Sequence, residues 1–432
     1  MKVIYLAFFS ALLLTQLPFL AAQETVEQDS RAEELRERRR QKGQEIVTPT
    51  TSGVTKAFIK MESGELVRQV KSIRWNDFYP RFGQISNNSG MGGGVRYYRR
   101  TGLGLNVEGS ATISFTNYRQ ADFHFGRFNQ MAPNTLLGPN AFGAPFDFGE
   151  ERPGQVKSYL YLDLRYRYFP RERFFGVGPD SSLDNRTSYL LEDGHYGAAA
   201  GYQFGRWLGV GARGAYLKVN TGPGTDDAFP KIGDLFDDNT APGLARQPDF
   251  LRFDSVLFVN LMDTPGNPHK GGAIGLSYSR YDARGDDEFD FDSISLDLRG
   301  YLPLGSRQRV LAVRFFASRN NADAGGRIPF YFMRTLGGKE TLRGFADLRF
   351  RDARMLYLSA EYRWEAAPAI EFAFFYDTGR VFPESEEIAF EHLEHNIGAG
   401  VRFKTVNQVI LRLDVGHGSE GTIVHFQFGP SF

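Results

Sequence analysis

Apolar and polar residues alternate along much of the chain from about residue 88 onward. In residues 409–415 aliphatic side chains occupy every second position, and Arg412 and Asp414 lie on the other face. Residues 159–168 repeat this pattern with Leu and Tyr on one face. A period of two predicts β-strands with one apolar and one polar face. The predicted strands run to about 9–12 residues, which is longer than the roughly 5 or 6 residues of an average soluble strand. A tilted strand needs about 9–11 residues to cross a bilayer.

Aromatic residues at strand ends favour a membrane barrel over a soluble sandwich. Tyr362 and Trp364 end one predicted strand, as expected where a barrel meets the lipid–water interface. We count about 14 strands, or 16 if residues 103–128 divide at Asn117 and one more strand lies upstream, and bacterial single-chain barrels have even strand numbers. The sequence therefore predicts an all-β fold, a transmembrane antiparallel β-barrel of about 14–16 strands.

Connections between the predicted strands alternate between short and long. Gly305-Ser306 and Ala367-Pro368 are short turns. The long connections are residues 220–249, 320–353 and 380–395. Barrels of this kind have short periplasmic turns and longer extracellular loops. We therefore expect residues 320–353 to form an extracellular loop.

The first residues indicate secretion. Lys2 precedes an uncharged apolar stretch that ends on Ala21-Ala22, the pattern of a secretory signal peptide; an uncleaved anchor is the alternative. Arg and Glu dominate residues 29–42, which is typical of a flexible charged tail. We expect residues 1–22 to be a signal peptide, 23–80 a charged periplasmic N-terminal tail, and 81–432 an outer-membrane β-barrel.

Composition removes several classes of function. Lys+Arg 51 balance Asp+Glu 51, so the chain has no global attraction for nucleic acid. It contains no Cys, which excludes disulfides and thiolate metal sites. A mean hydropathy of −0.36 suits a barrel with a polar lumen as well as a soluble protein.

The sequence motifs give little indication of a catalytic or a metal site. No Gly-x-Ser-x-Gly elbow is present, so we expect no enzyme, no catalytic residues and no cofactor. His392 and His395 have i, i+3 spacing beside two Glu, but a solvated loop is the simpler interpretation. The acidic runs around Asp237-Asp238 and Asp286-Asp287 lack the spacing of a calcium loop. We predict no metal site.

The C-terminus has the pattern of a barrel-closing strand. Phe426, Phe428 and Phe432 share one face, and the last residue is aromatic. Such a face meets lipid, so these residues form the predicted C-terminal barrel signature. We expect the outer-membrane lipid and, during biogenesis, the barrel-assembly machinery as partners.

One loop motif resembles a known family. Leu342-Arg343-Gly344-Phe345 is similar to the [VL]RG[FY] motif of the BamA/TamA surface-antigen superfamily, the outer-membrane assembly and translocation barrels. Phe375 to Gly379 (FYDTG) then resembles the F-x-D-x-G strand of the family. Three more predicted strands follow, and the last of them ends in Phe432. The order of these features makes the match more specific than four residues alone, and it covers residues 88–432.

The resemblance implies that the loop folds into the lumen. Arg343 would then meet Asp377 and Glu361, with Gly344 and Phe345 completing a tether. Strand parity agrees independently, since both carboxylates fall on polar faces. The planar guanidinium of Arg binds carboxylates in a bidentate manner and keeps its charge. Gly344 permits a sharp backbone turn.

The implied location is the bacterial outer membrane, and the implied role is to assist insertion or translocation of protein or lipid. Residues 23–80 lack the β-α-α-β-β rhythm of the periplasmic POTRA domains that family members carry, which indicates a short member without a full POTRA. A passive or gated channel, or a structural barrel with no client, is the alternative function.

Deleting Phe432 tests the C-terminal signature. The aromatic terminal residue is expected to aid recognition by the assembly machinery, so its loss should lower the amount of the protein in isolated outer membranes. Immunoblotting of membrane fractions measures this. Unchanged levels would mean that the aromatic face serves only as lipid-facing surface.

Overall fold

The structure is a computed structural model that describes residues 75–86, 88–102, 104–128, 157–205, 207–264, 266–404 and 409–428. All of these lie in one compact unit, Ala57–Phe432. The predicted signal peptide and most of the predicted tail lie outside the described residues. The first described strand begins at Phe78, three residues before the predicted start of the barrel at residue 81. The division of the chain into domains stays a prediction.

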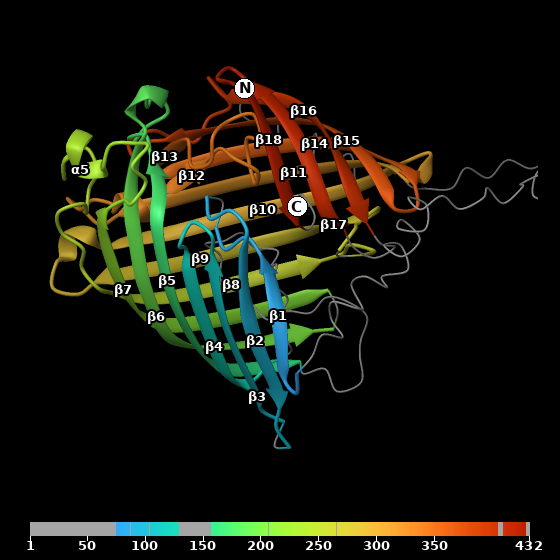
Figure 1. Ribbon diagram of the computed structural model, residues 1–432, viewed down its shortest axis with the longest axis horizontal. Coiled ribbons are helices and arrows are strands. Elements are labelled where there is room, and N and C mark those ends of the chain that lie inside the picture. Colours follow the sequence, from blue (N-terminus) through green and yellow to red (C-terminus); the bar gives the residue numbers. More distant parts are fainter. Residues whose placement is uncertain are drawn as a thin grey trace, which may run out of the picture. The chain divides into compact units, whose positions relative to one another are not determined.

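Sixteen antiparallel strands form one sheet in sequential order (Figure 1). They are β1 (Phe78–Gly83), β2 (Gly92–Arg100), β3 (Asn106–Ser114), β4 (Arg119–Arg127), β5 (Ser158–Phe174), β6 (Thr187–Phe204), β7 (Leu208–Pro223), β8 (Phe250–Asn260), β9 (Gly271–Ala283), β10 (Phe291–Leu304), β11 (Ser306–Ala322), β14 (Arg354–Ala367), β15 (Ile370–Phe382), β16 (Glu394–Lys404), β17 (Val409–Gly418) and β18 (Gly421–Phe428). Within the described residues, the short helical elements are η1 (Leu183–Asn185), α5 (Ile232–Leu235), η2 (Asp287–Phe289) and η3 (Phe330–Phe332). The all-β prediction is confirmed, and the sheet has the larger of the predicted strand numbers.

The count reaches sixteen by the route that the sequence indicated. Residues 103–128 divide into β3 and β4 at a turn in which Asn117 has a φ of 66°. Asn is among the few non-Gly residues that adopt this left-handed conformation readily. The additional upstream strand is β1, which pairs with β2 from Phe78↔Tyr97 to Gly83↔Gly92.

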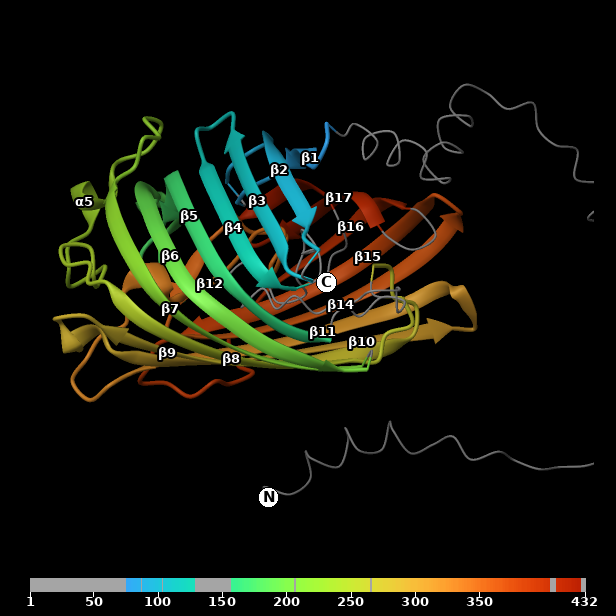
Figure 2. The ribbon, with the colours of Figure 1, turned by 90° about the horizontal axis from the view of Figure 1, so that it is seen from below.

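The two faces of the sheet have opposite character. Figure 2 shows the sheet curving, so that one face encloses an interior. On β17 the inward Arg412 and Asp414 are 1% and 0% exposed, whereas the outward Leu413 and Val415 are each 40% exposed. Polar inside and apolar outside is the reverse of a soluble protein and fits an outer face covered by lipid. None of the helices in the described residues has the length and apolar character needed to cross a membrane.

Most of the strand connections separate by length into two ends of the sheet. The exceptions include the long connection that joins Arg127 of β4 to Ser158 of β5 on the end with the short turns, and the short β17–β18 turn on the other end. One end carries short turns, such as Gly305 between β10 and β11. The other end carries the long connections 224–249, 323–353 and 383–393. Residues 323–353, between β11 and β14, are called the lumen loop from here on. The lumen loop contains η3 and a two-stranded sheet of β12 (Arg334–Leu336) and β13 (Phe350–Asp352), and β12 lies within the curve of the large sheet (Figure 2).

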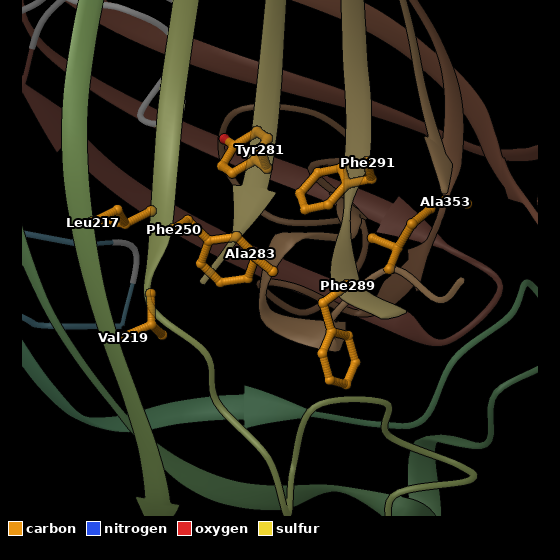
Figure 3. Packing of buried hydrophobic residues seen from close by; sticks show 9 residues of the cluster. Leu217, Val219, Phe250, Tyr281, Ala283, Phe289, Phe291 and Ala353 are labelled. Atoms are coloured by element: carbon orange, nitrogen blue, oxygen red, sulfur yellow. The ribbon is translucent and has the colours of Figure 1, made fainter. Parts of the chain in front are cut away.

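An apolar cluster holds both ends of the lumen loop against the inner wall, and Figure 3 shows part of it. Its buried members are Leu217, Val219, Phe250, Tyr281, Ala283, Phe289, Phe291, Ile328 and Ala353. Tyr281 and Phe291 stack with ring centroids 4.3 Å apart, and Phe332 of η3 packs against both rings. Burying such side chains contributes about 1.5–3 kcal/mol each. The entry and exit of the lumen loop are therefore held close to the ends of β7 to β10.

Candidate functional site

The lumen loop turns tightly just before its Leu-Arg-Gly-Phe motif. Gly337 and Gly338 follow β12 with φ values of 113° and 90°, which favour glycine. The Gly338 N–H lies 3.0 Å from the Leu342 carbonyl and 3.1 Å from the Phe345 carbonyl, so the turn closes on itself. Leu342 and Phe345 are both buried in a cluster with Leu336, Phe350, Met355, Tyr357 and Val381. The loop therefore presents residue 343 in a defined position.

Arg343 forms a bidentate pair with Asp377 of β15. Its Nε donates to Oδ2 at 2.9 Å and its Nη2 donates to Oδ1 at 2.8 Å. The carboxylate of Asp377 also accepts from Ser359 Oγ at 2.7 Å and from Asn396 Nδ2 at 3.0 Å. The side chain of Arg343 is 2% exposed and that of Asp377 is 0% exposed. This is a charge-assisted pair with planar complementarity, and further donors satisfy the acid.

Two more carboxylates and an aromatic ring complete the surroundings of Arg343. Nη1 donates to Glu361 Oε2 of β14 at 2.7 Å and lies 3.5 Å from Asp414 Oδ2 of β17. The guanidinium carbon lies 3.4 Å from the centroid of the Phe375 ring. Cation–π contacts strengthen when the groups are removed from water. We call Arg343, Glu361, Asp377 and Asp414 the arginine seat.

Other arginines of the wall neutralise the excess negative charge of the seat. Arg402 of β16 bridges Glu361 at 2.8 Å and Asp414 at 2.8 Å. Arg363 of β14 binds Glu361 at 2.7 Å. Buried charges are tolerated only when they are paired and hydrogen-bonded, because desolvation costs several kcal/mol per ion. The seat is therefore one connected network, and removing any member leaves a charge stranded.

Glycines allow the loop backbone to approach the wall. A Cβ at Gly416 of β17 would lie 2.5 Å from the Arg343 carbonyl oxygen, and one at Gly418 would lie 2.8 Å from the Phe345 ring. A Cβ at Gly344 would lie 2.6 Å from Asn396 Cβ. On β18, His425 Nε2 donates to the Arg343 carbonyl at 2.9 Å. Backbone packing therefore supplements the ion pairs.

The structure brings together the predicted residues Arg343, Gly344, Phe345, Asp377 and Glu361. Their role as a functional tether stays a prediction. Sequence reasoning missed Asp414, Arg402, His425, Gly416 and Gly418 as members or neighbours of the seat. Parity had placed Asp414 on the polar face of its strand, but only the register between strands reveals that it reaches the same level as Arg343.

The C-terminal signature is only partly described. Phe426 on β18 is 46% exposed on the outer face, as a lipid-facing residue would be. Phe428 ends β18, and Phe432 lies outside the described residues. The signature as a whole stays a prediction.

The acidic loop residues are occupied by local hydrogen bonds. The N–H of Thr240 donates to Asp237 Oδ1 at 3.0 Å, and this bond lowers the pKa of the Asp237 carboxyl. Asp238 accepts from Arg327 Nη2 at 3.0 Å. Within the described part of the chain, no group of three or more His, Asp or Glu side chains is arranged to hold a metal ion.

Comparison with known proteins gives a family match over part of the chain and a similar fold. Residues 248–432 match the Omp85 superfamily domain. The structure resembles BamA from Haemophilus ducreyi lacking POTRA domains 1–3, with a TM-score of 0.55 and 14% sequence identity over 83% of this chain and 70% of that chain. CdiB from Acinetobacter baumannii (TM-score 0.45, 12% identity, 82% of this chain, 58% of that chain) and CdiB from Escherichia coli (0.49, 12%, 83%, 63%) also match. The search of curated proteins found no match. At these identities the likeness to BamA shows the barrel fold alone.

Breaking the bidentate pair should release the lumen loop. Arg343→Ala and Asp377→Ala should each destabilise the barrel by up to about 3–5 kcal/mol, because each strands a buried charge. The double variant should be little worse than either single one, since the lost interaction is shared. Denaturant unfolding and external protease cleavage of residues 323–353 measure the effect.

Arg327→Ala is the matched control, because Arg327 is ion-paired in the same loop but 30% exposed, and its loss should lower the free energy of unfolding by about 1 kcal/mol or less. Additive effects of the two single substitutions would mean that Arg343 is held by other groups.

Filling the glycine contact should move the loop without altering a charge. Gly416→Ala should cost about 1–3 kcal/mol, the usual range for overpacking. The same protease assay and the thermal midpoint measure it. Gly93→Ala on β2 is the control, because a Cβ there meets nothing within 4 Å. Equal effects of the two substitutions would show that the contact with Arg343 is not the cause.

Proposed function

We propose that this outer-membrane protein, whose residues 248–432 belong to the Omp85 superfamily, assists the insertion or translocation of protein or lipid at the outer membrane without acting as an enzyme. One observation carries the proposal. The family match contains the lumen loop and all four residues of the arginine seat. The part of the chain that identifies the family is therefore the part that holds the loop against the wall.

The design of the seat supports a role beyond that of an inert wall. A buried ion network contributes little net stability compared with apolar packing of the same volume, because desolvation offsets the Coulombic gain. What it provides is one defined position for the lumen loop. A barrel that only had to be stable could place apolar side chains there. A loop held in one position by paired charges suits a protein whose interior must stay ordered while material passes along it.

The remaining assignments complete this proposal. Residues 1–22 serve as a signal peptide, and residues 23–80 serve as a charged periplasmic tail whose last three residues already belong to β1. Residues 81–432 continue the barrel from there. The outer-membrane lipid and the barrel-assembly machinery are the partners during biogenesis. The client is a protein or a lipid of the same membrane.

The second candidate, a passive or gated channel without a client, uses the same loop differently. In that case the lumen loop only limits permeation, and releasing it opens a path for ions. The contacts that fix the loop are common to both candidates, so activity in a membrane has to separate them.

Reconstitution into proteoliposomes distinguishes the two candidates. If the proposal is right, the protein should accelerate membrane insertion of an unfolded barrel substrate or the transfer of a fluorescent lipid between leaflets, relative to protein-free vesicles. Arg343→Ala should reduce this activity, and Arg327→Ala should retain it. Ion conductance is recorded on the same preparations. Conductance that rises in Arg343→Ala while neither insertion nor lipid transfer exceeds that of empty vesicles would establish the channel instead.

A further inference from the structure

Two adjacent residues of the lumen loop contact both edges of the sheet. The edges are β1 and β18, the first and last strands in the sheet order. Lys339 Nζ donates to the side-chain oxygen of Gln84, the residue that directly follows β1. Gln427 of β18 donates through Nε2 to a carboxylate oxygen of Glu340. A cation faces one edge and an anion faces the other. We call Lys339 and Glu340 the seam pair.

The C-terminal strands β17 and β18 hold the seam pair through Arg412. Arg412 of β17 donates from Nη2 to the Lys339 carbonyl at 2.8 Å and from Nε to Gln427 Oε1 at 3.1 Å. Lys339 is 7% exposed, so its side chain crosses to Gln84 largely out of water. The backbone of the pair is thus tied to β17, while its charged tips reach the two edge strands.

A second bridge joins the same two halves of the sheet at another level. Arg349, also in the lumen loop, donates from Nε to Glu420 Oε1 in the β17–β18 turn at 2.7 Å. It donates from Nη1 to Ser181 Oγ at 2.9 Å and from Nη2 to the Ser181 carbonyl at 2.6 Å, in the β5–β6 connection. The lumen loop therefore links the C-terminal strands to the N-terminal half of the sheet twice, through different residues.

We infer that the lumen loop acts as a strut across the seam between β1 and β18, with the seam pair setting how closely the two edges approach. Glu340 precedes Arg343 by three residues. Movement of the arginine seat is therefore transmitted to the seam pair, and separation of the edges pulls on the seat. The contacts of Lys339 and Glu340 with the two edge strands are made by side chains, so they can change while the backbone hydrogen bonds of the sheet stay intact. The position of the loop is thereby coupled to the spacing of the seam. The inference concerns the resting barrel and does not depend on the proposed function.

Gln84 offers a matched pair of substitutions to test the strut. Gln84→Glu supplies a carboxylate to Lys339, and Gln84→Lys places two cations together. Because the chain has no native Cys, spin labels can be attached without background. One label pair is Val95→Cys on β2 with Val415→Cys on β17, and it reports the distance across the seam. The native valines are 43% and 40% exposed on the outer face. Val95→Cys with Leu257→Cys on β8, which is 38% exposed, reports within the N-terminal half.

Pulsed electron spin resonance on the labelled protein in lipid nanodiscs, with no client present, gives the distances. The across-seam distribution should shift to longer distances and broaden in Gln84→Lys, and should stay as narrow or become narrower in Gln84→Glu. The distribution within the N-terminal half should be unchanged in both. Glu340→Ala provides the same readout from the other edge if Gln84→Lys does not fold. Identical across-seam distributions in the Glu and Lys variants, or equal broadening of the control pair, would overturn the inference.

Discussion

A guanidinium held among three carboxylates inside the barrel determines where the longest described loop lies. Arg343 reaches acids on β14, β15 and β17, so a single side chain connects the loop to three strands of the wall. Other features of the interior accommodate that placement. Gly416 and Gly418 leave space for the loop backbone, and the turn at Gly337 and Gly338 aims the arginine at its partners. The apolar cluster in Figure 3 brings the loop to the wall but is not directional, whereas the ion pairs select one arrangement.

The energetics of this arrangement favour specificity over stability. Each charge in the seat is removed from water at a cost that its partners roughly return. The network is nevertheless sensitive to any single loss, because Arg402 shares Glu361 and Asp414 with Arg343. The loss of one partner therefore disturbs the contacts of the others.

Much of the fold could be predicted because barrels have a period of two. Outward apolar and inward polar positions are visible in the sequence, and Asn117 marked the division between β3 and β4. The same parity placed Glu361 and Asp377 on the inner face, and the motif resemblance suggested Arg343 as their partner. The sequence did not reveal the contributions of Asp414, Arg402 and His425. They lie on β16 to β18, and the register that brings them level with Arg343 depends on how far each strand is shifted along the adjacent strand. The contact between Lys339 and Gln84 joins residues 255 positions apart in the sequence, and no local pattern marks it.

The order of strands along the chain gives the arginine seat a consequence for assembly. Asp414 belongs to β17 and His425 to β18, so the last two strands supply part of what holds Arg343. Until that C-terminal hairpin has joined the sheet, the loop has only an incomplete set of partners, and its cation remains under-compensated. Final locking of the interior must therefore follow completion of the wall. A chain truncated or stalled before β17 would keep Arg343 paired with Asp377 and Glu361 but would lack Asp414.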